Sequence, residues 1–175
     1  MDQNNLTVEQ IIQALGLQPL PVEGGLYRQT YISDERIPAG ALPERYEPAE
    51  KPFGTAIYYL LAGHPNSFSS LHRLPTDEVY HFYLGDPVEM TLLLADGSSR
   101  QVVLGQDLLA GQQVQFVAPR GAWQGSRLLP GGQYALLGTT MAPGFTPSDF
   151  ENGEREALLA QYPRERERIL ALTRS

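Results

Sequence analysis

Short β-prone segments separated by glycine and proline are the feature that most constrains the fold of this chain. The 175 residues include 17 glycines and 14 prolines. Turn signals recur about every eight to twelve residues over the middle of the chain, a spacing typical of antiparallel β-sandwiches and barrels. The hydrophobic fraction of 42% is ordinary for a folded domain. The pattern therefore predicts an all-β sandwich or barrel with short terminal helices.

Eight segments have the length and composition of strands. In chain order they are 26–32, 55–62, a strand beginning at Glu78, 88–95, 100–104, 114–117, 123–129 and 133–141. Asp96-Gly97-Ser98-Ser99 separates 88–95 from 100–104, and Pro130-Gly131-Gly132 separates the last two segments. Both arrangements predict β-hairpins.

One domain is expected over residues 1–175, because a chain of this length can bury an adequate core without disulfides or metals. Its expected parts are an N-terminal helix at 7–16, a barrel at 23–145 and a C-terminal helical tail at 148–173. Thr7 and Gln10 predict a capping box for the first helix. Ser148 or Asp149 is the expected N-cap of the tail.

Two connecting segments carry polar residues that could belong to a site. Residues 34–52 are rich in proline and charge and lack periodicity. They predict a long loop that is either mobile or a functional flap. His64 lies in the turn at 63–66, where we expect a solvated side chain.

Charge and cysteine content disfavour several classes of function. The formal net charge is −7 and no basic cluster is present, which disfavours nucleic-acid binding because that depends on concentrated positive charge. No apolar stretch of about 18 residues and no signal peptide is recognisable. The absence of cysteine excludes disulfides, thiolate nucleophiles and zinc–thiolate sites. We therefore expect a cytoplasmic protein with neither nucleic-acid nor membrane partners.

Polar residues interrupt the apolar pattern at His72, Glu78 and Gln124. Unpaired polar groups are costly to bury, so their presence in an apolar β-protein predicts a site. Side chains alternate along a strand, so Glu78 shares a face with Tyr80 and Phe82, whereas His81 faces the other side unless a bulge intervenes. We expect His72, Glu78 and Gln124 to converge in the mouth of the barrel.

Two histidines and a carboxylate support three interpretations. They can bind a divalent metal, or they can perform metal-free acid–base chemistry, since histidine titrates near neutral pH. In a purely structural interpretation, His72 caps a loop and His81 packs against aromatic residues. Glu78 then pairs with Arg73 or Arg28. Alternation alone allows Arg28 to point either into a pocket or into water.

The stretch from Ser70 to Gly85 resembles the first sequence motif of the cupin superfamily. Glu78 and Gly85 keep the spacing of that motif. His72 fits its second histidine, with one additional residue before Glu78. Ser70 stands where the first histidine belongs. The resemblance implies a cupin jelly-roll β-barrel of the RmlC-like type, also called a double-stranded β-helix.

The second cupin motif is matched at Pro119 and Gly121, with Gln124 in place of the metal-binding histidine. A narrower resemblance, over residues 7–162, is to cupin type 5, a subfamily of unknown function. It rests on Glu23-Gly24-Gly25 with Tyr27-Arg28, His72-Arg73, Asp77-Glu78, His81-Phe82-Tyr83, Trp123-Gln124, Ala142-Pro143-Gly144-Phe145 and Asp149-Phe150-Glu151. These motifs keep their order along the chain.

The departures from the cupin motifs weaken the case for a metal. The available ligands are His72, Glu78 and Gln124, and amide and hydroxyl oxygens bind zinc, iron or nickel weakly. We expect no resident cofactor other than a weakly bound divalent metal. The alternative is a pocket for a small polar metabolite, sugar- or nucleotide-like, with His72 and Glu78 as catalytic groups. The expected ligand-binding residues are Arg28, Ser70, Tyr80, His81, Phe82, Trp123 and Gln124.

The leading functional hypothesis is a metal-independent isomerase, epimerase or lyase with His72 as the base. Its analogy with cupin sugar-nucleotide epimerases is at the level of the fold. The alternatives are a binding or sensing module without turnover and a metal-dependent cupin oxygenase. The resemblance also implies a homodimer, and residues 23–32 are the expected interface.

Overall fold

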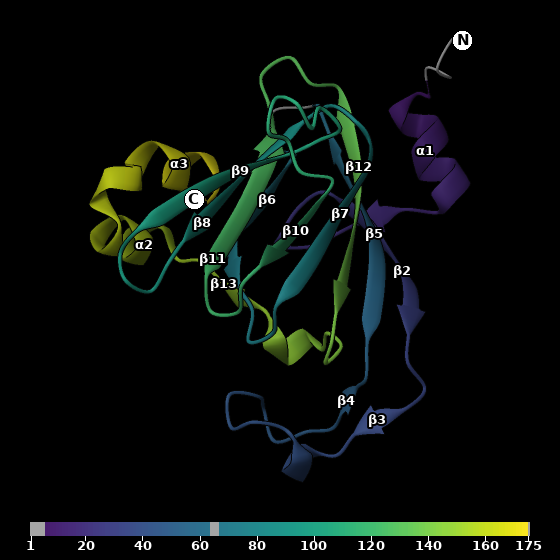
Figure 1. Ribbon diagram of the computed structural model, residues 1–175, viewed down its shortest axis with the longest axis vertical. Coiled ribbons are helices and arrows are strands. Elements are labelled where there is room, and N and C mark those ends of the chain that lie inside the picture. Colours follow the sequence, from purple (N-terminus) through teal and green to yellow (C-terminus); the bar gives the residue numbers. More distant parts are fainter. Residues whose placement is uncertain (1–5, 64–66, 175) are drawn as a thin grey trace.

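The computed structural model describes residues 6–63 and 67–174 and consists mainly of two β-sheets that face each other (Figure 1). The six-stranded sheet contains, in spatial order, β1 (Gln18–Pro19), β2 (Leu26–Ile32), β5 (Thr55–Ala62), β12 (Tyr134–Met141), β7 (Glu78–Gly85) and β10 (Gln115–Ala118). The five-stranded sheet contains β13 (Glu151–Asn152), β6 (Phe68–Arg73), β11 (Trp123–Leu128), β8 (Val88–Leu93) and β9 (Ser99–Leu104). Neighbouring strands are antiparallel throughout both sheets.

Successive strands repeatedly change sheets, which is the jelly-roll pattern. β5 and β7 belong to the six-stranded sheet, whereas β6 between them belongs to the five-stranded one. This confirms the expected all-β jelly roll. Among the described residues no ladder of strand pairs joins the two sheets, so the roll is open at its edges rather than a closed barrel.

The main core lies between the two sheets. On β7, Tyr80 and Phe82 are buried, whereas Val79, His81 and Tyr83 between and beyond them are more exposed. The inward side chains pack with Met90 of β8 and with similar residues of both sheets. The predicted alternation of this strand is therefore present, and it points Glu78 toward the interior.

One of the two predicted hairpins is present and the other is wrong. β8 and β9 pair across the Asp96-Gly97 turn as expected. β11 pairs instead with β6 and β8, while β12 pairs with β5 and β7. The Pro130-Gly131-Gly132 turn therefore carries the chain from one sheet to the other. Local turn chemistry fixes a chain reversal but does not determine which strand becomes the partner.

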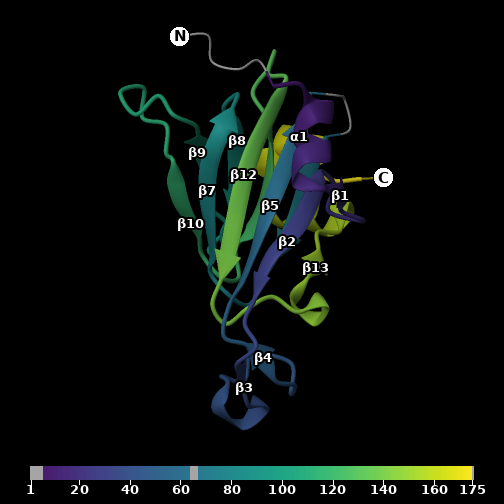
Figure 2. The ribbon, with the colours of Figure 1, turned by 90° about the vertical axis from the view of Figure 1, so that its right-hand side faces the viewer.

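The N-terminal helix, α1 (Val8–Leu15), has the predicted capping box between Thr7 and Gln10 and ends at Gly16. Gly16 has a φ of 62°, in the left-handed region typical of a helix C-terminus. Ile11 is the buried residue of this helix, and it packs with residues of the six-stranded sheet. Figure 2 shows α1 on the outer side of that sheet.

The C-terminal helices α2 (Arg155–Gln161) and α3 (Arg166–Ala171) lie against the outer face of the five-stranded sheet (Figure 1). The expected cap at Ser148 or Asp149 is wrong, because these residues lie in a separate 3-10 turn, Pro147–Asp149, capped by Thr146. The buried contacts of the tail are made by Leu158, Tyr162, Ile169 and Leu172 with Leu71, Leu93 and Trp123. No helix within the described ranges has the length and hydropathy needed to span a membrane.

Residues 33–54, called the flap below, extend beyond one end of the two sheets (Figures 1 and 2). They contain β3 (Arg36–Ile37) and β4 (Lys51–Pro52), which pair with each other, and the 3-10 turn Ala39–Ala41 between them. The sequence left open a mobile loop or a flap over 34–52. The structure gives this segment its own two-stranded sheet.

Candidate functional site

A cavity of about 520 Å³ lies between the sheets at the end that carries the flap. Its volume is within the usual range for small-molecule sites. Most of its wall is apolar, and the polar groups come from only a few residues. The lining residues are Leu20, Pro21, Val22, Glu23, Tyr27, Gln29, Ile32, Arg36, Pro52, Ile57, His72, Leu74, Glu78, Thr139, Met141, Phe145, Thr146, Pro147 and Phe150.

His72, Glu78 and Gln124 converge at the inner end of this cavity. His72 of β6 and Gln124 of β11 are directly opposite each other in the strand register, and Glu78 begins β7 in the other sheet. Gln124 Nε2 lies 2.6 Å from Glu78 Oε2 and 3.0 Å from His72 Nε2. All three side chains are at least 93% buried, with relative exposures of 2%, 7% and 3% for residues 72, 78 and 124. The amide thus bridges the two titratable groups.

The contacts of His72 specify one tautomer of its ring. Nδ1 lies 2.8 Å from the carbonyl oxygen of Ser70, which can only accept a hydrogen bond, so Nδ1 carries the hydrogen. Nε2 then has a lone pair and accepts from the amide of Gln124. The ring also stacks on Phe150, with 5.1 Å between centroids.

Glu78 accepts two hydrogen bonds, one from Gln124 and one from the hydroxyl of Tyr80 at 3.1 Å. Two donors satisfy the hydrogen-bonding needs of this buried carboxyl group. Burial, followed by the adjacent charge of Glu78, raises the pKa of Tyr80 well above its usual value of 10.0. Tyr80 therefore stays protonated and acts as a donor at any physiological pH.

Glu23 is a site residue that the sequence did not single out. It lines the cavity and accepts a hydrogen bond from the hydroxyl of Ser69 at 2.8 Å. Burial raises its pKa above the ordinary value of 4.5, and Glu78 adds to this, whereas His72 and the hydroxyls of Ser69 and Tyr59 lower it. Because His72 and Glu78 both affect its pKa, Glu23 belongs to the same cluster of titratable groups.

The backbone around Glu23 explains why the segment contains two glycines. Gly24 has a φ of 100°, and a Cβ on it would lie 2.4 Å from the carbonyl oxygen of Phe68. The amide of Ser70 donates to the carbonyl of Glu23 at 2.8 Å. Glycine at position 24 allows this loop to approach β6 closely. The Glu23-Gly24-Gly25 string was therefore the only sequence signal for Glu23.

The register shift between Gln124 and Ser126 decides which serine of β6 faces this group. Ser126 pairs with Ser69 and Gln124 with His72, so β6 has one additional residue over this stretch. Ser69 contacts Glu23, whereas the hydroxyl of Ser70 lies 3.4 Å from the carbonyl oxygen of Val22. Ser70 is buried but does not line the cavity.

Two of the expected ligand-binding residues lie on outer faces of the fold. His81 is on the outer face of the six-stranded sheet, where Nε2 is 3.1 Å from the Thr140 hydroxyl and the ring stacks on Tyr83. Arg28 is exposed, and its Nη1 donates to the carbonyl of Leu15 at the end of α1. Alternation along β2 instead places Tyr27 and Gln29 in the cavity.

Trp123 and Phe82 also lie away from the cavity. Trp123 packs against the C-terminal helices, with the guanidinium of Arg73 over its ring at 4.5 Å. Phe82 is part of the core between the sheets. Tyr80 reaches the site through its bond to Glu78. The predicted turn residue His64 lies outside the described residues.

The donor set does not fit a resident divalent metal. Gln124 presents its amide nitrogen to His72 and Glu78, and an amide nitrogen has no lone pair to give. Within residues 6–63 and 67–174, no group of three or more histidine, cysteine, aspartate or glutamate side chains is arranged to hold an ion.

Comparisons with known proteins identify relatives over nearly the whole chain. A protein of known structure from Shewanella oneidensis is 32% identical, covers 97% of this chain and 98% of its own, and superposes with a TM-score of 0.84. A hypothetical protein from Leishmania major is 29% identical, with 97% and 100% coverage and a TM-score of 0.86. An uncharacterised protein of Saccharomyces cerevisiae is 27% identical over 143 residues, which is 77% of this chain and 70% of that protein.

The sequence model of one protein family matches most of the chain. That family is described as cupin superfamily, DUF985, and its model matches residues 9–153. The match includes Glu23, His72, Glu78 and Gln124. The chain therefore belongs to the DUF985 family of the cupin superfamily.

Proposed function

We propose that this cupin binds a small metabolite in the cavity between its sheets and transfers a proton to or from it. The observation that carries the proposal is the grouping of Glu23, His72 and Glu78 at one end of a largely apolar cavity. Titratable groups with altered proton affinity in a cleft are typical of catalytic sites. The reaction class is isomerisation, epimerisation or elimination, each of which begins with removal of a proton.

The hydrogen bonds indicate a different role in proton transfer for each of Glu23, His72 and Glu78. Burial raises the pKa of Glu23, so of the two carboxyl groups it is the one we assign as proton donor. His72 has a basic Nε2, but this atom accepts from Gln124. A substrate C–H or O–H must therefore displace that amide before His72 can act as the base. Glu78 holds the amide and stabilises the imidazolium that forms.

The lining favours a ligand with an apolar or planar part. Tyr27, Phe145 and Phe150 contribute aromatic surface, and aliphatic side chains form most of the remaining wall. A sugar alone presents hydroxyls that this wall cannot pair. A nucleotide-like molecule or another metabolite with a planar body fits the lining better, with its polar end at Glu23 and Glu78.

The test is a thermal-shift screen of metabolites followed by a proton-exchange assay. A ligand of the cavity raises the melting temperature of wild type and of His81→Gln, which removes an imidazole outside the cavity. The shift is smaller in His72→Gln and Glu78→Gln. In D₂O, wild type incorporates deuterium into the bound metabolite and His72→Gln does not. An equal thermal shift in wild type and both site variants would reject the proposal.

A non-catalytic sensing module is the second candidate. The observation that favours it is the occupied lone pair of His72 Nε2, because a base held by an internal donor is not free to react. This function requires binding without turnover. Ligands that shift the melting temperature but never exchange deuterium would select it.

We also propose a homodimer through the segment 23–32. The support is that Tyr31 and Ile32 are exposed, at 55% and 43%, at the end of β2 that β1 does not cover and where β2 itself is the sheet edge. Apolar residues exposed at a sheet edge are typical of interfaces. Light scattering at micromolar concentration should give a dimer mass, and Tyr31→Lys should shift it to the monomer. A monomer mass for wild type would contradict this.

A further inference from the structure

We infer that Arg36 of the flap recognises an anionic group of the ligand, and that the ligand is amphoteric. Its hydrogen-bond-donating or cationic end lies inward at Glu23 and Glu78, and its carboxylate or phosphate lies at the flap. The inference rests on the proposed function, because it names the ligand class for the same cavity. It is carried by the distribution of charge along the cavity wall.

Charges of opposite sign line different parts of the cavity. Arg36 is the only arginine or lysine among the lining residues. It belongs to β3 in the flap, whereas His72 and Glu78 belong to strands of the two main sheets. An anion at the inner end would lie beside the carboxylate of Glu78 and be repelled, since like charges at short range in a partly dry site interact strongly.

Arg36 is available to a ligand. Within the described residues its side chain has neither an ion pair nor a hydrogen bond, and it is exposed at the cavity rim. Arg73, Arg127 and Arg168 each pair with a glutamate. The planar guanidinium can bind carboxylate or phosphate in a bidentate manner, which lysine cannot do.

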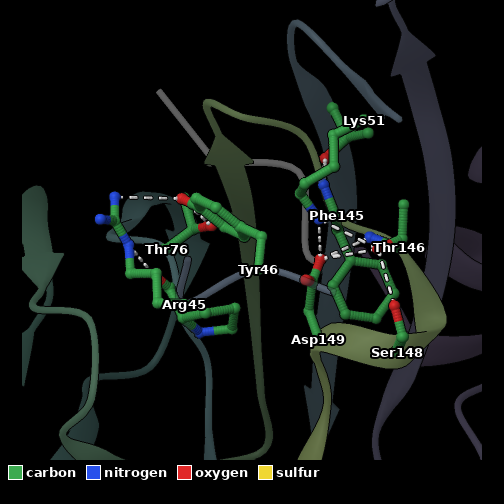
Figure 3. Close-up of polar contacts among 10 residues, drawn as sticks. Arg45, Tyr46, Lys51, Thr76, Phe145, Thr146, Ser148 and Asp149 are labelled. Carbon is green, nitrogen blue, oxygen red and sulfur yellow. Dashed lines mark hydrogen bonds and ion pairs between the residues drawn. The ribbon is translucent and has the colours of Figure 1, made fainter. Parts of the chain in front are cut away.

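The backbone of Arg36 is held in place by a buried ion pair. Arg36 is directly opposite Pro52 in the β3–β4 register, and the neighbouring Lys51 pairs with Asp149. Both charged side chains are nearly completely buried, at 3% and 2% exposure. Figure 3 shows Lys51 and Asp149 directed at each other beside Thr146, which lines the cavity and also bonds to both.

A second set of contacts ties the flap to the turn after β6. The Nε of Arg45 donates to the carbonyl of Pro75 at 3.0 Å, and the hydroxyl of Thr76 donates to that of Tyr46 at 2.9 Å (Figure 3). An exposed arginine on a loose loop would lose much of its binding energy to ordering. Here the flap is fixed at Arg45 and Tyr46 and again at Lys51, and β3 pairs with β4, so the side chain of Arg36 is what must be ordered.

The probes for the experiment are ω-amino acids of increasing length, from aminobutanoate to aminooctanoate. Each is compared with the alkylamine and the alkanoate of the same length, so that the anionic and cationic ends are tested separately. Affinities are measured by calorimetry on the full chain. The variants are Arg36→Gln, Glu78→Gln and, as a matched loss of charge outside the cavity, Arg120→Gln.

One ω-amino acid should bind wild type at least about tenfold more tightly than the amine of the same length. Arg36→Gln should remove this advantage and leave the affinity for the amine unchanged, while Arg120→Gln has no effect. Glu78→Gln should weaken both ligands. Equal affinities of amino acid and amine, an unchanged advantage in Arg36→Gln, or no binding by the whole series would overturn the inference. If Glu78→Gln loses amine binding but Arg36→Gln leaves the advantage of the amino acid unchanged, the inference about Arg36 fails while the proposed cavity is still supported.

Discussion

Gln124 donates an amide hydrogen to Glu78, with 2.6 Å between Nε2 and Oε2. Gln124 lies opposite His72 in the strand register, whereas Glu78 is the first residue of β7 in the other sheet. The same nitrogen donates to His72 at 3.0 Å. One uncharged residue therefore links a carboxylate and an imidazole that the sequence separates by a proline-containing turn. At the position where the cupin motif has a histidine, this chain has a group that donates rather than coordinates.

The amide of Gln124 should be required for the stability of the site. Gln124→Glu places a second carboxylate against Glu78 in a buried position, and we expect a loss of about 2–4 kcal/mol in the free energy of unfolding at pH 7. Above their ordinary pKa both carboxylates are charged in the unfolded state, whereas the buried pair in the folded state resists carrying two charges. The loss of stability should therefore shrink as the pH falls toward about 4. Urea denaturation at several pH values measures it. Gln115→Glu, exposed on the outer face, should change stability by less than about 0.5 kcal/mol.

The raised pKa of Glu23 should make the protein lose stability as the pH rises. Its ordinary value is 4.5 and burial raises it in the folded state. Between these two values the folded state holds a proton that the unfolded state has released, so the free energy of unfolding falls with increasing pH. Glu23→Gln cannot lose a proton, and its stability relative to wild type should increase over this range. A pH-independent difference between the two proteins would show that Glu23 titrates normally.

The buried pair of Lys51 and Asp149 should dominate the attachment of the flap. Asp149→Ala leaves an unpaired ammonium in a buried position, and we expect a cost of about 3–5 kcal/mol. The exposed pair of Arg127 and Glu89 offers a matched comparison, and Glu89→Ala should cost less than about 1 kcal/mol. Chemical denaturation of both variants gives the two values. Similar costs would mean that the ion pair contributes no more than a surface contact.

Replacing the bridging amide should restore part of the metal site of other cupins. An imidazole at position 124 supplies a ligand that zinc and nickel prefer to an amide. We expect Gln124→His to bind zinc at least about tenfold more tightly than wild type, as measured by competition with a chelator. Wild type purified without added metal should contain well below one equivalent. One equivalent of tightly held iron, nickel or zinc in wild type would contradict the assignment of donors.

Backbone strain at Gly24 provides a further test of how Glu23 is positioned. Gly24 and Gly97 both have positive φ, at 100° and 84°, but only Gly24 has neighbours where a Cβ would lie. Gly97→Ala should cost about 1 kcal/mol, and Gly24→Ala clearly more, because it also displaces the carbonyl of Phe68. Thermal denaturation compares them. Gly24→Ala should also reduce ligand binding, whereas Gly97→Ala should not.

Local patterns in the sequence determined the elements and the facing of their residues. The capping box at Thr7 and the left-handed Gly16 delimit α1 as predicted, because caps act within one helical turn. The two-residue period of β7 put Glu78 on the inner face and His81 on the outer one. Motif spacing correctly brought His72, Glu78 and Gln124 together.

Only the tertiary structure decided how these elements meet. The pairing of β11 and β12 with different sheets, the additional residue of β6 between Ser69 and His72, and the arrival of Glu23 beside His72 depend on contacts between distant segments. Lys51 and Asp149, 98 positions apart, convert an irregular loop into an anchored flap. Side-chain period and turn chemistry extend over a few residues, whereas the choice of strand partner and the pairing of buried charges are set by packing of the whole chain.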